Sequence, residues 1–387
     1  MKKLVIKNIG QILSGKLEKP IFDGDCIIAI DGKITEWGAE KNLDCEGATT
    51  LVDAHGVTVM PGLIDSHIHP VIGDYTPRQQ QLNWIDSTLH GGVTTLISAG
   101  EVHMPGRPKD IVGLKAMAIA AQRWYENFRP SGVKVHAGAP VIEHGMVEQD
   151  FKDLADAGVT LLGEVGLGTV KDGKTAQQMV GWARKYGIQS TIHTGGPSIP
   201  GSGLIDANMV IETGTDVIGH INGGHSALPD DQIICLCESC SSAFEIVHNG
   251  NERSAVLALN TARELGKLDQ IILGTDGPAG SGVQPLGIMR MVAMLSAFGN
   301  VPAEKAFCFG HGNTSRQRNL DTGLIEAGYA ADFVLLDKAQ HAPGKTMLES
   351  VQLGNLPGVG MTIIDGEVTS GRSRNTPPAD RLPEHIK

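Results

Sequence analysis

Short apolar segments recur along the middle of the chain, and each ends in polar or glycine-rich residues. Stretches with the periodicity of an amphipathic helix separate most of them, at a repeat of about 25 to 40 residues. The segments are residues 59–67, 93–99, 133–138, 160–165, 190–193, 216–220, 244–247 and 270–274. This alternation predicts eight βα units of an α/β protein that close into a (β/α)8, or TIM, barrel.

Both ends of the chain have a different pattern, in which apolar and polar residues alternate as they do in β-strands. Each end also contains an Asp-Gly pair that is typical of a two-residue hairpin turn. The pairs are Asp31-Gly32 and Asp365-Gly366.

The two ends are expected to form one domain, because each alone is too short for a stable sheet. We therefore predict a barrel of residues 58–322 and a small composite β-sandwich of residues 1–57 and 323–387. The tail from Arg372 contains Pro377-Pro378 and is expected to be an extended arm.

Composition and charge restrict the partners of the protein. Hydrophobic residues make up 41% of the 387 residues and charged residues 19%, so a large core is possible. A formal net charge of −11 argues against nucleic acid or an anionic membrane as the main partner. The N-terminus lacks the apolar run of a signal peptide, and no segment reaches the roughly 18 apolar residues of a membrane span. We expect a cytoplasmic protein that acts on a small molecule.

Three of the six cysteines are clustered, as Cys235, Cys237 and Cys240. No second Cys or His pair stands near them to complete a closed structural metal site. The run 230–242 has the pattern of a helix, in which small apolar cysteines pack readily. We therefore interpret the cluster as packing residues.

The first apolar segment ends in His67 and His69. Two histidines at positions i and i+2 of a strand point to the same face, so both imidazoles can reach one metal ion. A His-x-His pair alone also fits polar residues that simply end a strand. The later strand ends decide between these interpretations.

Four later segments end in further metal-ligand residues, namely Glu164, His193, His220 and Asp276. The carboxyl ends of all strands of a parallel barrel lie on one rim, where active sites are built. Four histidines and two carboxylates are thus expected to converge on one opening, a coincidence that structural roles alone do not explain.

Histidine and carboxylate ligands suit Zn²⁺, while Fe²⁺ and Mn²⁺ are also chemically reasonable. We predict two divalent metal ions that lower the pKa of a shared water and polarise a substrate carbonyl. Glu164 is placed to bridge the metals. Asp276 is placed to take the proton of the attacking water and pass it to the leaving nitrogen.

With these residues in view, the chain resembles the amidohydrolase superfamily. Residues 61–69, with the sequence Pro-Gly-Leu-Ile-Asp-Ser-His-Ile-His, match its first-strand signature, and the resemblance covers nearly the whole chain. It implies that His67, His69 and Asp276 bind the more buried metal, and that His193 and His220 bind the second. The chain departs from many binuclear members in having Glu164 where they have a carbamylated lysine.

Further segments are similar to those of superfamily members that open a cyclic enamide in bacterial nicotinate fermentation. They are residues 73–79, 89–95, 97–100, 105–110, 163–169, 193–196, 198–202, 220–224 and 373–379. This likeness implies hydrolysis of 6-oxo-1,4,5,6-tetrahydronicotinate, with loss of ammonia to give 2-formylglutarate. It also implies a zinc and iron-type centre and a homo-oligomer, for which a tetramer is favoured.

A substrate of this kind carries a carboxylate, so a cation is expected to face the pocket. Arg107 and Arg78 are the candidates in the loops after the first two strands. A solvated surface position is the alternative for each arginine.

Other pocket residues are expected after strands five to seven. Residues 194–203 are rich in Gly and Ser and could bind substrate or close over it. The candidates for substrate contact are Thr194, Gly195, Asn222, His225 and His248.

Two other functions are compatible with the same ligand residues. A deaminase or deacetylase of the superfamily would use the same metals, and substrate profiling would distinguish it from a cyclic amide hydrolase. A non-catalytic scaffold would be expected to have lost some ligands, whereas all six are present.

Overall fold

Parallel strands and helices alternate through the middle of the chain, as the sequence pattern predicts. The computed structural model describes residues 1–70, 84–100, 106–224, 226–278 and 282–387. One parallel sheet has the order β10-β9-β8 and a second has the order β11-β12-β13-β14. Their strands are β8 (Leu63–Ile68), β9 (Val93–Ser98), β10 (Lys134–His136), β11 (Thr191–Ile192), β12 (Val217–Ile218), β13 (Ala243–Val247) and β14 (Ile271–Gly274).

Isolated bridges connect these two sheets. Ile68 forms a parallel bridge with Gly277, which brings the end of β14 beside β8. The predicted strand 160–165 consists of only two parallel bridges, from Leu161 and Val165 to the region of β11. A continuous strand is interrupted at Gly163, where a Cβ atom would lie 2.6 Å from the carbonyl oxygen of Ala139.

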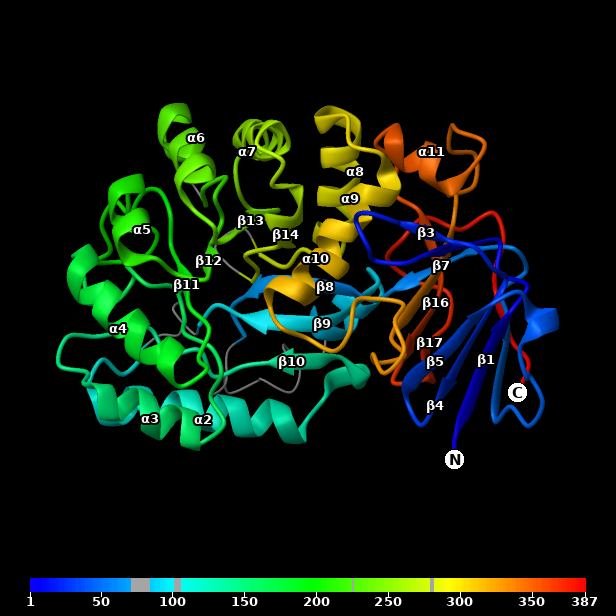
Figure 1. Cartoon of the computed structure of the whole chain (residues 1–387), viewed down its shortest axis with the longest axis horizontal. Helices are drawn as coiled ribbons and strands as arrows, with labels where there is room; N and C mark the ends of the chain where they lie inside the picture. The colour runs from blue at the N-terminus through cyan, green and yellow to red at the C-terminus, as the bar shows by residue number, and fades with distance from the viewer. Residues whose placement is uncertain (71–83, 101–105, 225, 279–281) are drawn as a thin grey trace.

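Helices cover the outside of these strands (Figure 1). Several begin at an Asp or Asn whose side chain accepts a backbone N–H of the first turn, as at Asp110, Asp172 and Asn251. Among the described residues, none of the helices has both the length and the apolar character that a bilayer span requires. The helices are α2 (Ile111–Asn127), α3 (Glu148–Asp156), α4 (Gly173–Lys185), α5 (Ala207–Thr213), α6 (Asp230–Ser239), α7 (Glu252–Glu264), α8 (Gly287–Gly299), α9 (Ala303–Gly310), α10 (Gly312–Gln317) and α11 (Met347–Gln352).

Strands from both ends of the chain combine in two further sheets, at the right of Figure 1. One sheet has the order β18-β6-β1-β4-β5 and the other β17-β16-β15-β7-β2-β3, so each contains strands from both ends. The strands are β1 (Lys3–Lys7), β2 (Gln11–Leu13), β3 (Ile21–Phe22), β4 (Cys26–Ile30), β5 (Lys33–Gly38), β6 (Thr50–Asp53), β7 (Thr58–Pro61), β15 (Phe333–Asp337), β16 (Gly358–Ile364), β17 (Glu367–Ser370) and β18 (Glu384–His385).

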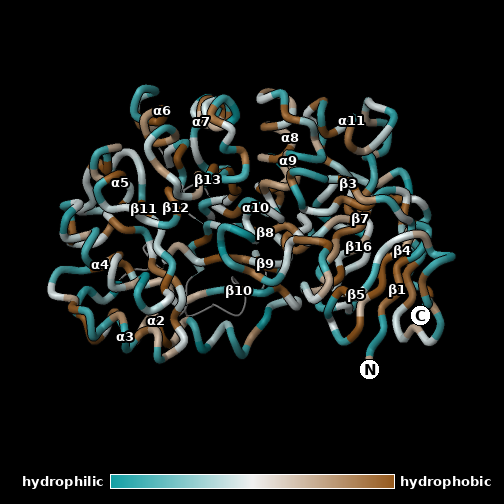
Figure 2. Tube along the Cα trace, viewed as in Figure 1, coloured by the Kyte–Doolittle hydropathy of each residue, from teal (hydrophilic) through white to brown (hydrophobic). Residues whose placement is uncertain are grey.

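One apolar cluster joins these terminal sheets. It includes Ile6 and Ile27 of the first sheet and Phe333 and Ile363 of the second, all fully buried. Hydrophobic residues concentrate along the strands of both parts of the molecule in Figure 2. The expected combination of both chain ends is thus present in both the hydrogen bonding and the packing.

The first apolar segment is divided between the two parts, whereas a single strand over residues 59–67 was expected. Residues of β7 pair with β15 of the terminal sheets, and β8 begins only at Leu63. Gly62 lies between them, and a Cβ atom there would be 2.0 Å from the hydroxyl oxygen of Thr94. The close approach of β9 at this point therefore requires glycine.

The two Asp-Gly turns are confirmed. Asp31 and Gly32 have φ angles of 47° and 79° and join β4 to β5. Asp365 and Gly366 have φ angles of 49° and 77° and join β16 to β17. Two successive positive φ angles are what a type I′ hairpin turn needs.

The cysteine cluster lies on and after α6, as the helical pattern predicts. Cys237 is buried, and Lys267 donates hydrogen bonds to the carbonyl oxygens of Cys237 and Cys240. The groups of metal-ligand side chains found among the described residues contain none of these cysteines.

Candidate metal centre

Six side chains at or just after the strand ends meet in one buried cluster. His67 lies in β8 and His69 just beyond it, while Glu164 lies between the two bridges to β11. The remaining three directly follow, or nearly follow, β11, β12 and β14, and are His193, His220 and Asp276. Five of the six are buried, and the side chain of Asp276 is 15% exposed. The structure thus brings together the six side chains that were expected at one opening, and their role as metal ligands stays a prediction.

Glu164 is at the centre of the cluster. Its Oε1 lies 2.7 Å from Nε2 of His220, 3.2 Å from Nδ1 of His193 and 3.8 Å from Nε2 of His67. Its Oε2 lies 3.6 Å from Nε2 of His69. One carboxylate thus faces all four imidazoles, which is the position that a bridging ligand requires.

The potential ligand atoms form two overlapping groups of three. One consists of His67, His69 and Asp276, and the other of His67, Glu164 and His220. In the first, Oδ1 of Asp276 lies 3.1 Å from Nε2 of His69 and 3.7 Å from Nε2 of His67. Within each group the ligand atoms all lie within 4.8 Å of one another.

Each of three imidazoles turns one nitrogen toward an acceptor in the protein and the other toward the cluster. Nδ1 of His67 lies 2.5 Å from Oε2 of Glu245, and Nδ1 of His69 lies 2.7 Å from the carbonyl oxygen of Gly100. His193 is reversed, with Nε2 2.9 Å from the carbonyl oxygen of Gly196 and Nδ1 toward Glu164. An acceptor on one nitrogen leaves the lone pair of the other free to bind a metal.

The buried atoms of the cluster fit divalent metal ions. Nε2 of His67 is buried and has no hydrogen-bond partner among the described residues, although it faces Glu164 and Asp276. A buried polar atom without a partner is costly, and a metal ion would satisfy it. Neutral imidazoles and carboxylates are also the donors that zinc and ferrous iron accept.

Electrostatics favour positive charge in the cluster. Burial alone would lower the pKa of His67 and of His69, but the surrounding carboxylates outweigh it and raise both pKa values. Burial would raise the pKa of Glu164 and of Asp276, but hydrogen bonds and charge interactions with the histidines outweigh it and lower both. The same negative field of the carboxylates would stabilise bound cations.

Left-handed backbone geometry places two of the ligands. His220 and Asp276 have φ angles of 31° and 59°. The hydroxyl of Thr194 donates to the carbonyl oxygens of Gly219 and His220, at 3.0 and 2.8 Å. Nδ2 of Asn249 donates to the carbonyl oxygen of Asp276 at 2.7 Å. Neighbouring side chains therefore support the uncommon conformations.

The residues after strands five and six that were predicted to contact substrate form hydrogen bonds or close contacts with backbone atoms of the protein. Besides the bonds of Thr194, the Asn222 side chain accepts from the Val247 amide and donates to the Val247 carbonyl, both at 2.9 Å. Gly195 has a φ of 97° and bridges Ile205, and a Cβ atom there would lie 2.4 Å from the Ser226 carbonyl oxygen. These residues hold the loops in place.

Two other residues predicted to contact substrate form fewer side-chain hydrogen bonds with the described residues. Nη1 of Arg107 lies 3.1 Å from Oε1 of Glu143, in an ion pair with side chains 6% and 1% exposed. His248 follows β13, and its buried Nδ1 has no partner among the described residues. Burial lowers the pKa of His248, which favours the neutral form of its ring. Arg78, His225 and residues 73–79 lie outside the described residues.

Sequence reasoning missed four residues that support the ligands, Asp65, Glu245, Thr275 and Arg318. Glu245 had a visible signal, since it is a lone charged residue within the apolar strand β13. Arg318 had none, because it follows α10 and is distant in sequence from the residues that it contacts, such as Ser66 and Glu245.

Comparison with known proteins agrees with this geometry. The family model described as Amidohydrolase family matches residues 58–369. The chain belongs to the amidohydrolase family. Members of this superfamily use a divalent metal centre, and the family assignment makes the chain a hydrolase of C–N bonds.

Within the amidohydrolase family, the chain is 44% identical to an enamidase of Eubacterium barkeri over 381 residues, which is 98% of this chain and 99% of the relative. The crystal structure of an enamidase superposes with a TM-score of 0.96 at 43% identity and covers 100% of both chains. A β-aspartyl dipeptidase from Fervidobacterium islandicum AW-1 has a TM-score of 0.66 at 18% identity, covering 98% of this chain and 99% of that one, and shares the fold. The predicted resemblance to the cyclic-enamide hydrolases is confirmed.

Proposed function

We propose that this chain is an enamidase that hydrolyses 6-oxo-1,4,5,6-tetrahydronicotinate. The observation that carries the proposal is the 44% identity to an enamidase over nearly the full length of both chains. The buried cluster of His67, Glu164, Asp276 and their neighbours supplies the side chains that the reaction needs. No feature of the described residues favours a deaminase or a deacetylase instead.

The proposed reaction consumes two water molecules. The first adds to the ring carbonyl carbon, the C–N bond breaks, and the ring opens to a carboxylate and an enamine. The enamine tautomerises to an imine, and the second water replaces its nitrogen, which leaves as ammonia. The product is 2-formylglutarate.

Two divalent metals, when bound, acidify a water and polarise the substrate carbonyl. We propose that His67, His69 and Asp276 hold one metal, and that His193 and His220 hold the other. Glu164 lies between both groups and is the proposed bridge. Zinc is the proposed metal for at least one position, with ferrous iron as the candidate for the other.

Asp276 is the proposed proton carrier. It is the only one of the six whose side chain is clearly accessible, at 15% exposure, so its carboxylate can reach the attacking water. It would take a proton from the attacking water and donate it to the ring nitrogen as the C–N bond breaks.

Arg107 is the proposed partner of the substrate carboxylate. Among the described residues, its ion pair with Glu143 uses one nitrogen, Nη1, whereas a guanidinium has five N–H donors. Glu143 also accepts the Thr169 amide at 2.7 Å, which fixes its own position. Thr194, Gly195 and Asn222 would then shape the pocket through the loops they hold, and the neutral ring of His248 would contact the substrate.

We further propose that residues 58–322 form one closed (β/α)8 barrel and that residues 1–57 and 323–387 form the β-sandwich. A cytoplasmic homotetramer is the proposed working form. Light scattering of the purified protein measures the mass in solution, and a mass of one chain would contradict the tetramer.

The test of the proposed function combines metal analysis with an activity assay. Elemental analysis of purified protein is expected to give about two metals per chain. Ammonia release from 6-oxo-1,4,5,6-tetrahydronicotinate is expected in the wild type and is expected to be nearly abolished in Asp276→Asn. Two metals without ammonia release would contradict the substrate, and a folded, metal-supplied protein that binds none would contradict the metal centre.

A further inference from the structure

A charged pair lies buried beneath the metal cluster, on the side of His67 that faces away from the other ligands. Glu245 is a fully buried residue of the otherwise apolar strand β13. Its Oε2 lies 2.5 Å from Nδ1 of His67, and its Oε1 accepts the hydroxyl of Ser66 at 2.5 Å. Both oxygens of this carboxylate therefore contact side chains of β8, and one of these is the proposed ligand His67.

Arg318 completes the pair. Its Nη2 lies 3.0 Å from Oε1 of Glu245, and both side chains are at most 2% exposed. It also donates to the hydroxyl oxygen of Ser66 through Nε at 2.8 Å and to the Ser66 carbonyl through Nη2 at 2.9 Å. Nη1 donates to Gln189 and Thr191, at 3.2 and 3.1 Å.

Every N–H of the Arg318 guanidinium thus has an acceptor, because the five bonds equal the five donors of the group. The acceptors belong to β8, β11, β13 and the segment before β11. Of these strands, β8 contains His67 and β11 directly precedes His193. One side chain from outside the strands therefore connects the elements that place ligands on both sides of the cluster.

The geometry also determines which nitrogen of His67 carries the proton. A carboxylate can only accept hydrogen bonds, so Glu245 requires a hydrogen on Nδ1 of His67. The neutral imidazole then has its lone pair on Nε2, the buried atom that has no partner among the described residues. That lone pair points toward Glu164 and Asp276.

Stability alone is a poor explanation for this pair. Well-packed apolar side chains in place of a buried ion pair are often as stable or more stable, because removing two charges from water is costly. A buried pair that holds a metal-binding histidine has a separate benefit, since partners of ligands commonly alter metal affinity by about 10- to 100-fold.

We propose that Glu245 and Arg318 are positioning residues of the metal centre, which fix the tautomer and the orientation of His67 from below. The proposal rests on the metal centre of the proposed function. Neither residue touches the substrate: Glu245 acts through His67, and Arg318 acts through Glu245 and Ser66.

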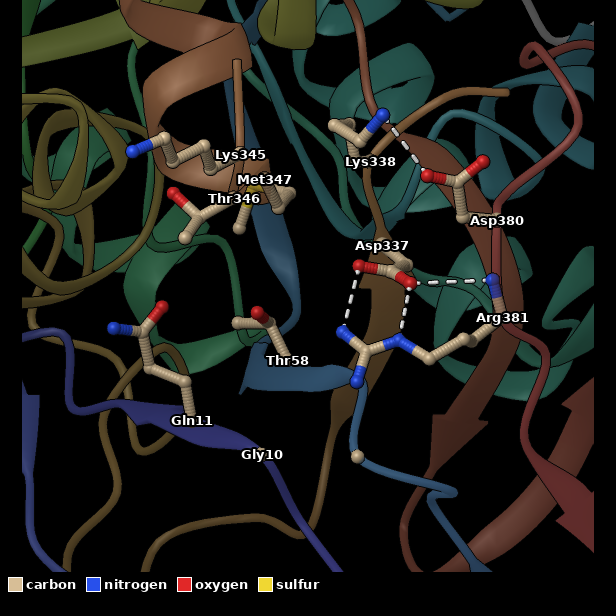
Figure 3. A pocket seen from close by; sticks show the side chains of 11 residues that line it. Gly10, Gln11, Thr58, Asp337, Lys338, Lys345, Thr346, Met347, Asp380 and Arg381 are labelled. Atoms are coloured by element: carbon tan, nitrogen blue, oxygen red, sulfur yellow. Dashed lines mark hydrogen bonds and ion pairs between the residues drawn. The ribbon is translucent and has the colours of Figure 1, made fainter. Parts of the chain in front are cut away.

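A matched control exists in the terminal sheets. Asp337 of β15 is also a buried carboxylate, and Arg381 holds it with Nε 2.8 Å from Oδ2 and Nη2 3.1 Å from Oδ1. Figure 3 shows this pair in a cavity of about 590 Å³ whose lining residues include none of the six ligands. Asp337→Asn therefore removes an arginine–carboxylate pair without touching the metal cluster.

The experiment compares Glu245→Gln and Asp337→Asn with the wild type, using Co²⁺ as the probe metal. Competition with a chelator measures the affinity, and visible absorption of the bound Co²⁺ reports the ligand geometry. We expect Glu245→Gln to bind Co²⁺ about 10- to 100-fold more weakly with an altered spectrum. Asp337→Asn is expected to lose thermal stability while its Co²⁺ affinity and spectrum stay unchanged.

Two further variants cover the case in which Glu245→Gln does not fold. Ser66→Ala removes one hydroxyl between the two charged groups and is expected to weaken Co²⁺ binding several-fold. Arg318→Lys keeps the positive charge but loses the planar guanidinium that donates to several acceptors at once. Unchanged affinity and spectrum in a folded Glu245→Gln, or in both Ser66→Ala and Arg318→Lys, would overturn the proposal. Absence of Co²⁺ binding by the wild type would instead contradict the metal centre itself.

Discussion

The carboxylate of Asp65 accepts two hydrogen bonds from Thr275, one from the backbone nitrogen at 2.8 Å and one from the hydroxyl at 2.6 Å. The backbone N–H of His67 also donates to Oδ1 of Asp65 at 3.2 Å. These bonds connect β8 to the end of β14, directly beside the ligands His67 and Asp276. Burial raises the pKa of Asp65 to about 7, against the opposing effect of the three donors.

Thr275→Val is expected to loosen this connection. The valine has nearly the same shape but no hydroxyl, so a buried carboxyl group loses one donor, at a cost of about 1–3 kcal/mol. Chemical denaturation of the metal-free protein measures the loss. Thr275→Ser restores the donor and is expected to recover most of the stability, and equal stability of Thr275→Val and wild type would show that the hydroxyl does not contribute.

Asp276→Asn is expected to remove activity without removing the fold. Asparagine tolerates the φ of 59° at this position, so the backbone need not change. The amide cannot accept and pass on a proton, and loss of such a group lowers kcat by about 10²- to 10⁴-fold. Steady-state assays measure kcat, and circular dichroism checks the fold. A folded variant with wild-type kcat would exclude Asp276 as the proton carrier.

Glu164→Gln is expected to lower the metal content from about two to about one per chain, because a neutral amide is a weak bridge between two cations. Elemental analysis after dialysis measures the content. Glu148→Gln is a suitable control, since Glu148 is an acid of α3 that pairs with Lys185 at the surface. Two tightly held metals in Glu164→Gln would place the bridge on another residue.

Arg107→Met is expected to raise KM for the carboxylated substrate by about 10-fold or more, since charge-assisted hydrogen bonds contribute about 1.5–3 kcal/mol. Glu143→Gln is the matched control, because it breaks the same ion pair but keeps the guanidinium. For a substrate analogue with a carboxamide in place of the carboxylate, the KM values of wild type and Arg107→Met should differ far less. If Glu143→Gln raises KM as strongly, the ion pair and not the substrate contact is responsible.

Asp365→Asn is expected to change the acid stability of the protein. Asp365 pairs with Arg129 and Lys134, and these contacts outweigh burial and lower its pKa. A lowered pKa gives stability that is present above the ordinary Asp pKa of about 4 and is lost as the pH falls through the folded-state value.

Asparagine keeps the positive φ of the turn, so the variant should be less stable at pH 7 by up to about 1 kcal/mol, because the pairs are partly exposed. The difference from wild type should shrink below about pH 4. Thermal denaturation of the metal-free proteins between pH 7 and pH 3 measures it. A difference independent of pH would mean that packing in the turn, and not charge, is what the variant alters.

The sequence predicts which side chains meet in the cluster, because each of them lies at or just after the end of an apolar segment in a repeat. His193 and Asp276 are recognisable in this way without any knowledge of their contacts. The i, i+2 spacing of His67 and His69 likewise indicates that both side chains lie on the same face of the strand. Periodicity along the chain and the common direction of parallel strands are sufficient for this part of the site.

The supporting residues depend on contacts that periodicity does not record. Arg318 is more than 70 residues from Glu245 and more than 250 from Ser66, yet it binds both. Gly62 lies between β7 and β8, where the hydroxyl of Thr94, a neighbour only in space, leaves no room for a side chain. Asn222 was predicted in the pocket because of its place after a strand, and periodicity does not record that its amide bonds the backbone of Val247 and Asn251.

The interleaving of both chain ends in the terminal sheets has a consequence for how the protein is made. On the ribosome, β7 and β6 emerge early, but their partners β15 and β18 emerge last. The edges of the early strands therefore stay unpaired while the whole catalytic region is synthesised. Unpaired strand edges are prone to form hydrogen bonds with the wrong strands. A chain released before β15 would carry all six metal ligands and still lack the strand that closes the sheet against Val59 and Met60.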